Sequence, residues 1–309
     1  MAILKIGNEA LQVAVDSHGA ELNSIRSADG AEWLWQGDPE FWNGRAPILF
    51  PVVGRSPDST VTIGGRKFPM SNHGFARTTE FAAVEQRPET LRLRIVDSEE
   101  TRKSYPFAFQ LDIVFALEGA TLVNRAEVRN TGSVRMPFSL GFHPAFFWPL
   151  PGGERKTHFV TLADTEEPPT LRLGDKLVLA PGEELTVFTE GRFAPSPADF
   201  ERDAIIIDDI RSHRATFGVD GGPQVLVTWD GLTALGLWQK PGAAYLCIEP
   251  WQGLPPYVGG SVALEERPGI VWLDPGASRT FTMTITPHAP PGLGRPAECR
   301  PFEFAQCVQ

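Results

Sequence analysis

Residues 109–117 read FQLDIVFAL, and this stretch decides the fold because large apolar side chains occupy every second position. Side chains of a β-strand point alternately to opposite faces, so a period of two predicts a half-buried strand. The same period recurs in LQVAV at 11–15, LRLRI at 91–95 and FTMTI at 281–285. Strands therefore span most of the chain, and we expect a predominantly β protein.

Short turn sequences separate these runs and favour antiparallel neighbours, because glycine and asparagine supply the positive φ angles of hairpin turns. They are ADG at 28–30, GG at 64–65, EGA at 118–120, NTG at 130–132 and DGG at 220–222. No window shows a long helical stripe, and residues 98–104 could form one short helical turn. The fold class we predict is all-β, a large antiparallel β-sandwich.

Bulk composition limits the function and the compartment. The formal charge of −10 disfavours nucleic acid and anionic membranes as partners. No segment approaches the roughly 18 apolar residues of a membrane span. Only three cysteines occur, without CxxC spacing, so we expect a cytoplasmic protein without a disulfide framework. We expect one domain over residues 1–289 and an irregular extension over 290–309, where the alternation is lost.

The first segment with chemical potential is SNHGFAR at 71–77, where His73 precedes a glycine that allows close backbone approach. Arg77 follows four positions later. These residues could hold a ligand. The alternative is a turn with a solvent-facing histidine.

The second segment is GFHPAFFW at 141–148, which places the imidazole of His143 among aromatic side chains. Apolar surroundings lower the pKa of a histidine, and aromatic faces suit sugar rings. The alternative is a core histidine whose ring bonds to a backbone carbonyl.

The third segment is YLCIEPW at 245–251, in which Glu249 shares one strand face with Tyr245 and Cys247. Both faces are largely apolar. An unpaired carboxylate there costs several kcal/mol, unless its pKa rises toward neutrality, where it can act as a general base. The alternative is an edge-strand glutamate that Pro250 turns toward water.

In this order, HGFAR, GFHPAF and IEPW resemble the signature set of the aldose 1-epimerase (galactose mutarotase) superfamily, in its bacterial HGFAR-containing branch. The stretch APILFPVVGR at 46–55 also resembles the arginine-bearing segment of that family. The resemblance runs from about residue 19 to 287. It implies a galactose mutarotase-like β-supersandwich that interconverts the α and β anomers of a free aldose without metal or cofactor.

The resemblance also implies roles for individual residues. Glu249 would be the general base at the anomeric hydroxyl, and His143 the general acid at the ring oxygen. His73 would hydrogen-bond near the ring oxygen. Residues that would bind the sugar are Arg55, Arg77, Asp203 and Trp251. Asp208 and Asp209 are alternatives to Asp203, because no distinctive motif selects among the three.

Two departures leave the preferred sugar open. HGFAR replaces a more glycine-rich histidine segment of the galactose mutarotases, and the Asn-Arg pair of those enzymes is not evident around Arg55. A hexose-6-phosphate mutarotase is one alternative, and it would need a cationic pocket. The side chains that could supply that pocket are Arg45, Arg55, Arg66 and Lys67.

A non-catalytic carbohydrate-binding β-sandwich is the other alternative, since 8 tryptophans and 20 phenylalanines could stack on sugars. The histidines show no HxxxH or HxH spacing, so we predict no metal site. The expected partner is a small-molecule sugar, bound by a monomer or a homodimer.

Overall fold

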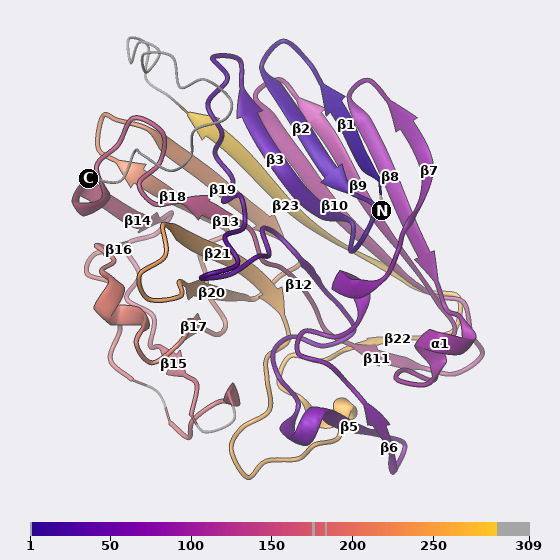
Figure 1. Ribbon diagram of the computed structural model, residues 1–309. Helices are drawn as coiled ribbons and strands as arrows, with labels where there is room; N and C mark the ends of the chain where they lie inside the picture. Colours follow the sequence, from indigo (N-terminus) through magenta and orange to yellow (C-terminus); the bar gives the residue numbers. More distant parts are fainter. Residues whose placement is uncertain (1, 175–176, 183, 289–309) are drawn as a thin grey trace.

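The computed structural model describes residues 2–174, 177–182 and 184–288, and strands are its main secondary structure (Figure 1). The alternating run at 109–117 forms β9 (Phe109–Glu118). It pairs with β8 (Thr90–Val96) on one side and β10 (Thr121–Asn130) on the other, both antiparallel. These pairings confirm the prediction drawn from the period of two.

The larger sheet has nine strands in the order β16-β14-β18-β19-β23-β10-β9-β8-β7, and every neighbouring pair is antiparallel. Its remaining strands are β7 (Ala82–Arg87), β14 (His158–Leu162), β16 (Arg192–Phe193), β18 (Arg214–Val219), β19 (Gln224–Asp230) and β23 (Ser278–His288). β23 lies between β10 and β19, so it joins strands from the two halves of the chain (Figure 1).

The second sheet has seven strands, with the order β15-β17-β20-β21-β12-β4 and β13 paired to β21. Its strands are β4 (Ile48–Leu49), β12 (Leu140–Phe142), β13 (Ala145–Phe147), β15 (Leu171–Arg172), β17 (Ile205–Ile207), β20 (Ala234–Trp238) and β21 (Tyr245–Gln252). Its strand pairs are antiparallel as well. β21 is central, and all of its residues are buried.

One apolar core joins the two sheets. Leu111 and Ile113 of β9 belong to the same buried cluster as Leu246 and Ile248 of β21. Residues that alternate with these on β21, among them Cys247, belong to a different cluster. The predicted antiparallel β-sandwich is thus confirmed, and the face of β21 that carries Glu249 looks away from the shared core.

Smaller elements complete the fold. They are the sheet of β1 (Ile3–Gly7), β2 (Leu11–Asp16) and β3 (Glu21–Ser27), the hairpin of β5 (Thr60–Ile63) and β6 (Arg66–Pro69), and the pair β11 (Met136–Phe138) and β22 (Val271–Leu273). The short helix α1 (Glu99–Arg102) is capped by Ser98, which confirms the helical turn expected at 98–104. Short 3₁₀ helices are η1 (Pro57–Ser59), η2 (Ala76–Thr78), η3 (Arg155–Thr157), η5 (Pro197–Phe200) and η6 (Leu264–Glu266).

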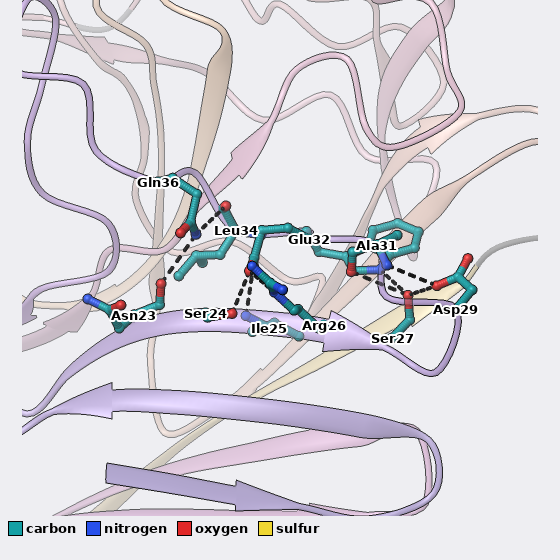
Figure 2. A network of polar contacts seen from close by, with 11 residues as sticks. Asn23, Ser24, Ile25, Arg26, Ser27, Asp29, Ala31, Glu32, Leu34 and Gln36 are labelled. Atoms are coloured by element: carbon teal, nitrogen blue, oxygen red, sulfur yellow. Dashed lines mark hydrogen bonds and ion pairs between the residues drawn. The ribbon is translucent and has the colours of Figure 1, made fainter. Parts of the chain in front are cut away.

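A polar network after β3 fixes the segment that leads toward the seven-stranded sheet (Figure 2). The carboxylate of Glu32 accepts the backbone N–H groups of Ile25 at 2.9 Å and Leu34 at 3.2 Å. Trp35 then donates its backbone N–H to Ala145 of β13 at 2.9 Å. Its indole N–H donates to the carbonyl of Trp42 at 2.9 Å. Trp42 is therefore held beside the sheet face that carries Glu249.

The extension expected over 290–309 lies outside the described residues, and the single domain over 1–289 stays a prediction. Among the described residues, the structure contains no helix with the length and apolar character that a membrane span requires.

Candidate active site

A cavity of about 150 Å³ opens on the outer face of the seven-stranded sheet. Side chains from segments far apart in the sequence line it, so it exists only in the folded chain. Every site residue selected from the sequence is among them: Arg55, His73, Arg77, His143, Asp203, Glu249 and Trp251. The structure thus brings the whole selected set together, although it does not assign the chemical role of each member.

Glu249 lies inside β21 and is 1% exposed. The strand continues through Pro250 to Gln252, and Pro250 pairs with Leu235 of β20. The alternative of an edge-strand glutamate turned toward water is therefore wrong, because β21 has neighbours on both sides. The Oε2 atom of Glu249 lies 3.0 Å from Nε2 of His143. Neither carboxylate oxygen is in hydrogen-bond geometry with any partner among the described residues.

His143 lies in the short connection between β12 and β13 and is 7% exposed. Its ring packs against Trp42, with centroids 5.1 Å apart, and against Trp238 at 5.7 Å. Its Nδ1 atom has no hydrogen-bond partner among the described residues. His143 is buried, as the alternative of a core histidine requires, and its own backbone carbonyl acts to raise its pKa, but the ring also lines the cavity and is accessible to a ligand.

Burial shifts both members of this pair toward their neutral forms. It raises the pKa of Glu249 well above the usual value, and the negative charge of Asp203 adds to the effect. Burial also lowers the pKa of His143 well below the usual value, and the neighbouring basic groups His73 and Arg77 act in the same direction. Both shifts favour a proton on the carboxyl group beside a neutral imidazole. Because the groups are in contact, they titrate as a coupled pair.

His73 occupies a turn with a φ of 62°, and the next residue, Gly74, has a φ of 77°. A side chain at Gly74 would place Cβ 2.1 Å from the carbonyl oxygen of Phe50, so this close approach requires glycine. The Nδ1 atom of His73 accepts the N–H of Gly54 at 3.1 Å, which leaves Nε2 to carry the proton. Burial, with the charges of Arg77 and Arg55, lowers the pKa of His73 to about 3. The solvent-facing alternative is wrong, since this ring is half-buried and lines the cavity.

Charged side chains occupy other parts of the cavity wall. Arg55 is exposed, whereas Arg77 in η2 is half-buried, and burial lowers the pKa of Arg77. Asp203 is also half-buried, and burial raises its pKa above the usual value. Asp208 and Asp209 are exposed and do not line the cavity. The structure therefore selects Asp203 from the three candidate aspartates.

Trp251 lies across the backbone of its two neighbouring strands. A Cβ atom at Gly141 of β12 would be 2.5 Å from its indole, and one at Gly236 of β20 would be 2.8 Å away. Glycine at both positions lets the ring lie flat on the sheet. The indole N–H is directed at the carboxyl group of Glu249 and acts to lower its pKa against the larger effect of burial, although the contact lies outside strict hydrogen-bond geometry.

Sequence reasoning missed several lining residues. Trp42 and Trp238 belong to the aromatic wall around His143, and Leu173 and Leu177 close another side. Trp238 carries a usable signal, since it ends a strand and pairs with Cys247, two positions before Glu249. The other three lie in irregular segments without a pattern that could have selected them.

The cationic pocket considered for a sugar phosphate is not assembled. Of its four proposed members only Arg55 lines the cavity. Arg66 and Lys67 project as exposed residues from the β5–β6 hairpin, and Arg45 lies outside the lining set. The hairpin carries Arg66 and Lys67 away from Arg55, and the arginines that line the cavity are Arg55 and Arg77.

One group of described residues has the composition of a metal site. Ligand atoms of His143, Cys247 and Glu249 lie within 4.8 Å of one another, and all three residues are buried. A metal ion would require Cys247 as a thiolate. Burial and the neighbouring Glu249 raise the pKa of this thiol well above its usual value, so the donor set favours a protonated sulfur instead.

Known proteins share this architecture. The sequence model of a family described as aldose 1-epimerase matches residues 2–286. Protein LacX of Lactococcus lactis subsp. lactis, in its plasmid form, is 29% identical over 295 residues, which cover 91% of this chain and 99% of LacX. The solved structure of a galactose mutarotase related enzyme from Lactobacillus acidophilus is 30% identical, with a TM-score of 0.88, and the match covers 94% of this chain and 98% of that one.

The solved structure of a galactose mutarotase-like protein from Lactobacillus casei is 26% identical, with a TM-score of 0.87. The match covers 93% of this chain and 100% of that one. The two structures share the sandwich with this chain over nearly its full length. With this fold and a family match that runs from residue 2 to 286, the chain belongs to the aldose 1-epimerase family.

Proposed function

We propose that this protein is a cofactor-independent aldose 1-epimerase that interconverts the α and β anomers of a free aldohexose. The observation that carries the proposal is the contact of 3.0 Å between Oε2 of Glu249 and Nε2 of His143 in the cavity. Both carboxylate oxygens and Nδ1 of His143 are outside hydrogen-bond geometry with any described residue. Buried polar atoms are normally hydrogen-bonded, so these atoms are available to bind the polar groups of a ligand. A sugar hydroxyl and a ring oxygen supply the missing partners.

The reaction needs one base and one acid. Glu249 as a carboxylate takes the proton of the anomeric hydroxyl, and His143 as an imidazolium gives a proton to the ring oxygen while the bond from C1 to that oxygen breaks. The open-chain aldehyde rotates about its C1–C2 bond, and closure from the other face returns both protons. One proton leaves the sugar and one enters it, so no external acid or base is consumed.

The pair must therefore hold a single proton. In the empty cavity the pKa shifts favour that proton on Glu249, whereas the reaction in this direction begins with it on His143. The contact of 3.0 Å is short enough for transfer between the two groups. The protonated Nε2 of His73 then supports the charge that develops at the ring oxygen, because it donates without being ionised.

The remaining lining groups suit a neutral sugar. Arg55 and Arg77 offer donors to hydroxyl oxygens, and Asp203 offers an acceptor. A carboxylate in the same small cavity would repel a phosphate, so we favour the free sugar over its 6-phosphate. A binding module would not need an unpaired acid and base at the sugar, which favours an enzyme over a lectin.

Polarimetry tests the proposal directly. Freshly dissolved α-glucose and α-galactose should equilibrate faster with the wild type than in buffer, and glucose 6-phosphate serves as the comparison substrate. Glu249→Gln and His143→Ala should remove the acceleration. The matched controls Glu40→Gln and His213→Ala change exposed residues outside the cavity and should retain it.

Tryptophan fluorescence separates the enzyme from a binding module, because Trp42, Trp238 and Trp251 line the cavity. Sugar should still change the fluorescence of Glu249→Gln. If the wild type binds sugar yet accelerates no sugar tested, the carbohydrate-binding alternative replaces the proposal.

A further inference from the structure

Arg267 is a buried cation without a counter-charge in the part of the chain that the structure describes. It follows η6, is 3% exposed and forms no ion pair with any described residue. Burial lowers its pKa to about 10, which still leaves the guanidinium charged at neutral pH. An unpaired buried charge is costly. The hydrogen bonds of Arg267 show which part of the structure the buried guanidinium holds in place.

The guanidinium spans a short loop, residues 53–56 (VGRS), which we call the Arg55 loop. One Nη atom donates to the carbonyl of Val53 at 3.2 Å, and the other donates to the hydroxyl of Ser56 at 2.5 Å. Both acceptor residues are buried. A planar fork fixes two acceptors at a set separation, which a lysine ammonium cannot do.

The Arg55 loop carries two determinants of the cavity. Arg55 itself reaches the cavity from an exposed position. Gly54, with a φ of 72°, donates its N–H to Nδ1 of His73 and accepts the backbone N–H of His73 at 3.0 Å. Arg267 does not line the cavity, yet it holds the loop on both sides of these two residues.

The residues after Arg267 also brace the strand of Glu249. The carbonyl of Pro268 accepts the N–H of Leu254 at 3.0 Å, and the carbonyl of Gly269 accepts the side-chain amide of Gln252 at 2.7 Å. Gln252 is the last residue of β21. The segment 267–269 thus ties the Arg55 loop to the end of the strand that carries the proposed base.

We propose that Arg267 is a positioning residue: it fixes the Arg55 loop so that Gly54 sets the tautomer of His73 and Arg55 reaches the sugar. The kinetic part of this inference rests on the proposed function. The tautomer of His73 is independent of it, because it depends only on the folded structure.

The test compares Arg267→Met, Arg267→Lys and the control Arg94→Met. Arg94 pairs with buried Asp112 in the nine-stranded sheet, so its loss also removes a charged contact, but away from the cavity. For glucose and galactose we expect Arg267→Met to lower kcat/KM by about tenfold or more, the effect of losing hydrogen bonds to a charged group. KM should rise because Arg55 no longer reaches the sugar, and kcat should fall because His73 loses its fixed tautomer. Arg267→Lys should fall between it and the wild type, and Arg94→Met should leave KM unchanged.

Two further measurements exclude a merely structural effect. Long-range ¹H–¹⁵N spectra should show the proton of His73 on Nε2 in the wild type and a mixture of tautomers in Arg267→Met. Added guanidinium, at concentrations far below those that denature, should lower the KM of Arg267→Ala and leave the KM of the wild type unchanged. If Arg267→Met does not fold, Arg267→Lys and this rescue still decide the question.

Equal losses in Arg267→Met and Arg94→Met, or a wild-type His73 spectrum with an unchanged KM in a folded Arg267 variant, would overturn the inference. If the wild type accelerates no sugar, the proposed function fails, and the His73 spectra alone support or refute the role of Arg267.

Discussion

Gly141→Ala is the sharpest test of how Trp251 is placed. The new Cβ would lie 2.5 Å from Cδ1 of Trp251 and 3.1 Å from Cδ1 of Leu49. Carbon atoms pack at about 3.5–4.0 Å, so the indole must move by about 1 Å or more. Such overpacking costs about 1–3 kcal/mol. Alanine returns about 0.5 kcal/mol through the unfolded state, because Gly141 does not have a positive φ.

We therefore expect a net loss of about 0.5–2.5 kcal/mol in the free energy of unfolding, measured by urea denaturation. Gly132→Ala is the matched control, since its Cβ would meet nothing closer than 3.4 Å and its φ is not positive. It should be neutral or slightly stabilising. The displaced indole also changes the cavity, so KM should rise for Gly141→Ala.

A double-mutant cycle isolates the cause. In a Trp251→Ala background, Gly141→Ala should cost little, which gives a coupling of about 1 kcal/mol or more between the two positions. If Gly141→Ala lowered the free energy of unfolding equally with and without the indole, or did not lower it, the packing of Trp251 against Gly141 would be refuted.

Other outcomes follow from the titrating and paired groups. The mutarotation rate should fall at both acid and alkaline pH, because the Glu249–His143 pair works with a single proton; a rate that stays flat from about pH 4 to about pH 10 would contradict this. The folded-state pKa of Glu249 is raised, so the folded state binds the proton more tightly, and the stability of the wild type should fall relative to Glu249→Gln as pH rises above the unfolded value of 4.5. Urea denaturation at acidic and at alkaline pH measures that difference, and a constant difference would argue against a buried neutral carboxyl. Asp112→Asn should lower stability by about 1–3 kcal/mol with kcat/KM unchanged, because Arg92 and Arg94 lose their shared carboxylate partner; equal stability at neutral pH would show that the network contributes nothing. The pKa of Asp112 is depressed, so this contribution should be present above its unfolded value and disappear as pH falls through the folded one.

The strands and the burial of Glu249 could be predicted because their signals are local, whereas the acid and base roles came from the family resemblance and stay predictions. The alternation at 109–117 indicates a strand whichever strands become its neighbours. Apolar residues on both faces of 245–251 indicate that Glu249 is buried if this strand lies inside a sheet. These inferences need no knowledge of distant contacts.

The rest of the site depends on contacts between distant segments. No sequence motif separates Asp203 from Asp208 and Asp209. The folded loop places only Asp203 of these three at the cavity wall. Arg66 and Lys67 are close to Arg55 in sequence, but the β5–β6 hairpin directs them to solvent. Arg267 contacts the Arg55 loop across more than two hundred positions, and its own neighbourhood in the sequence carries no motif. Local patterns cannot encode such pairings.

The place of β23 in the larger sheet has a consequence for biosynthesis. It is the last described strand, yet it fills the gap between β10 and β19. While the ribosome is still making residues 278–288, both of those strands present open edges, which are templates for pairing with other chains. The larger sheet is therefore completed only after synthesis has passed this strand, and until then its two halves are not joined by their shared neighbour.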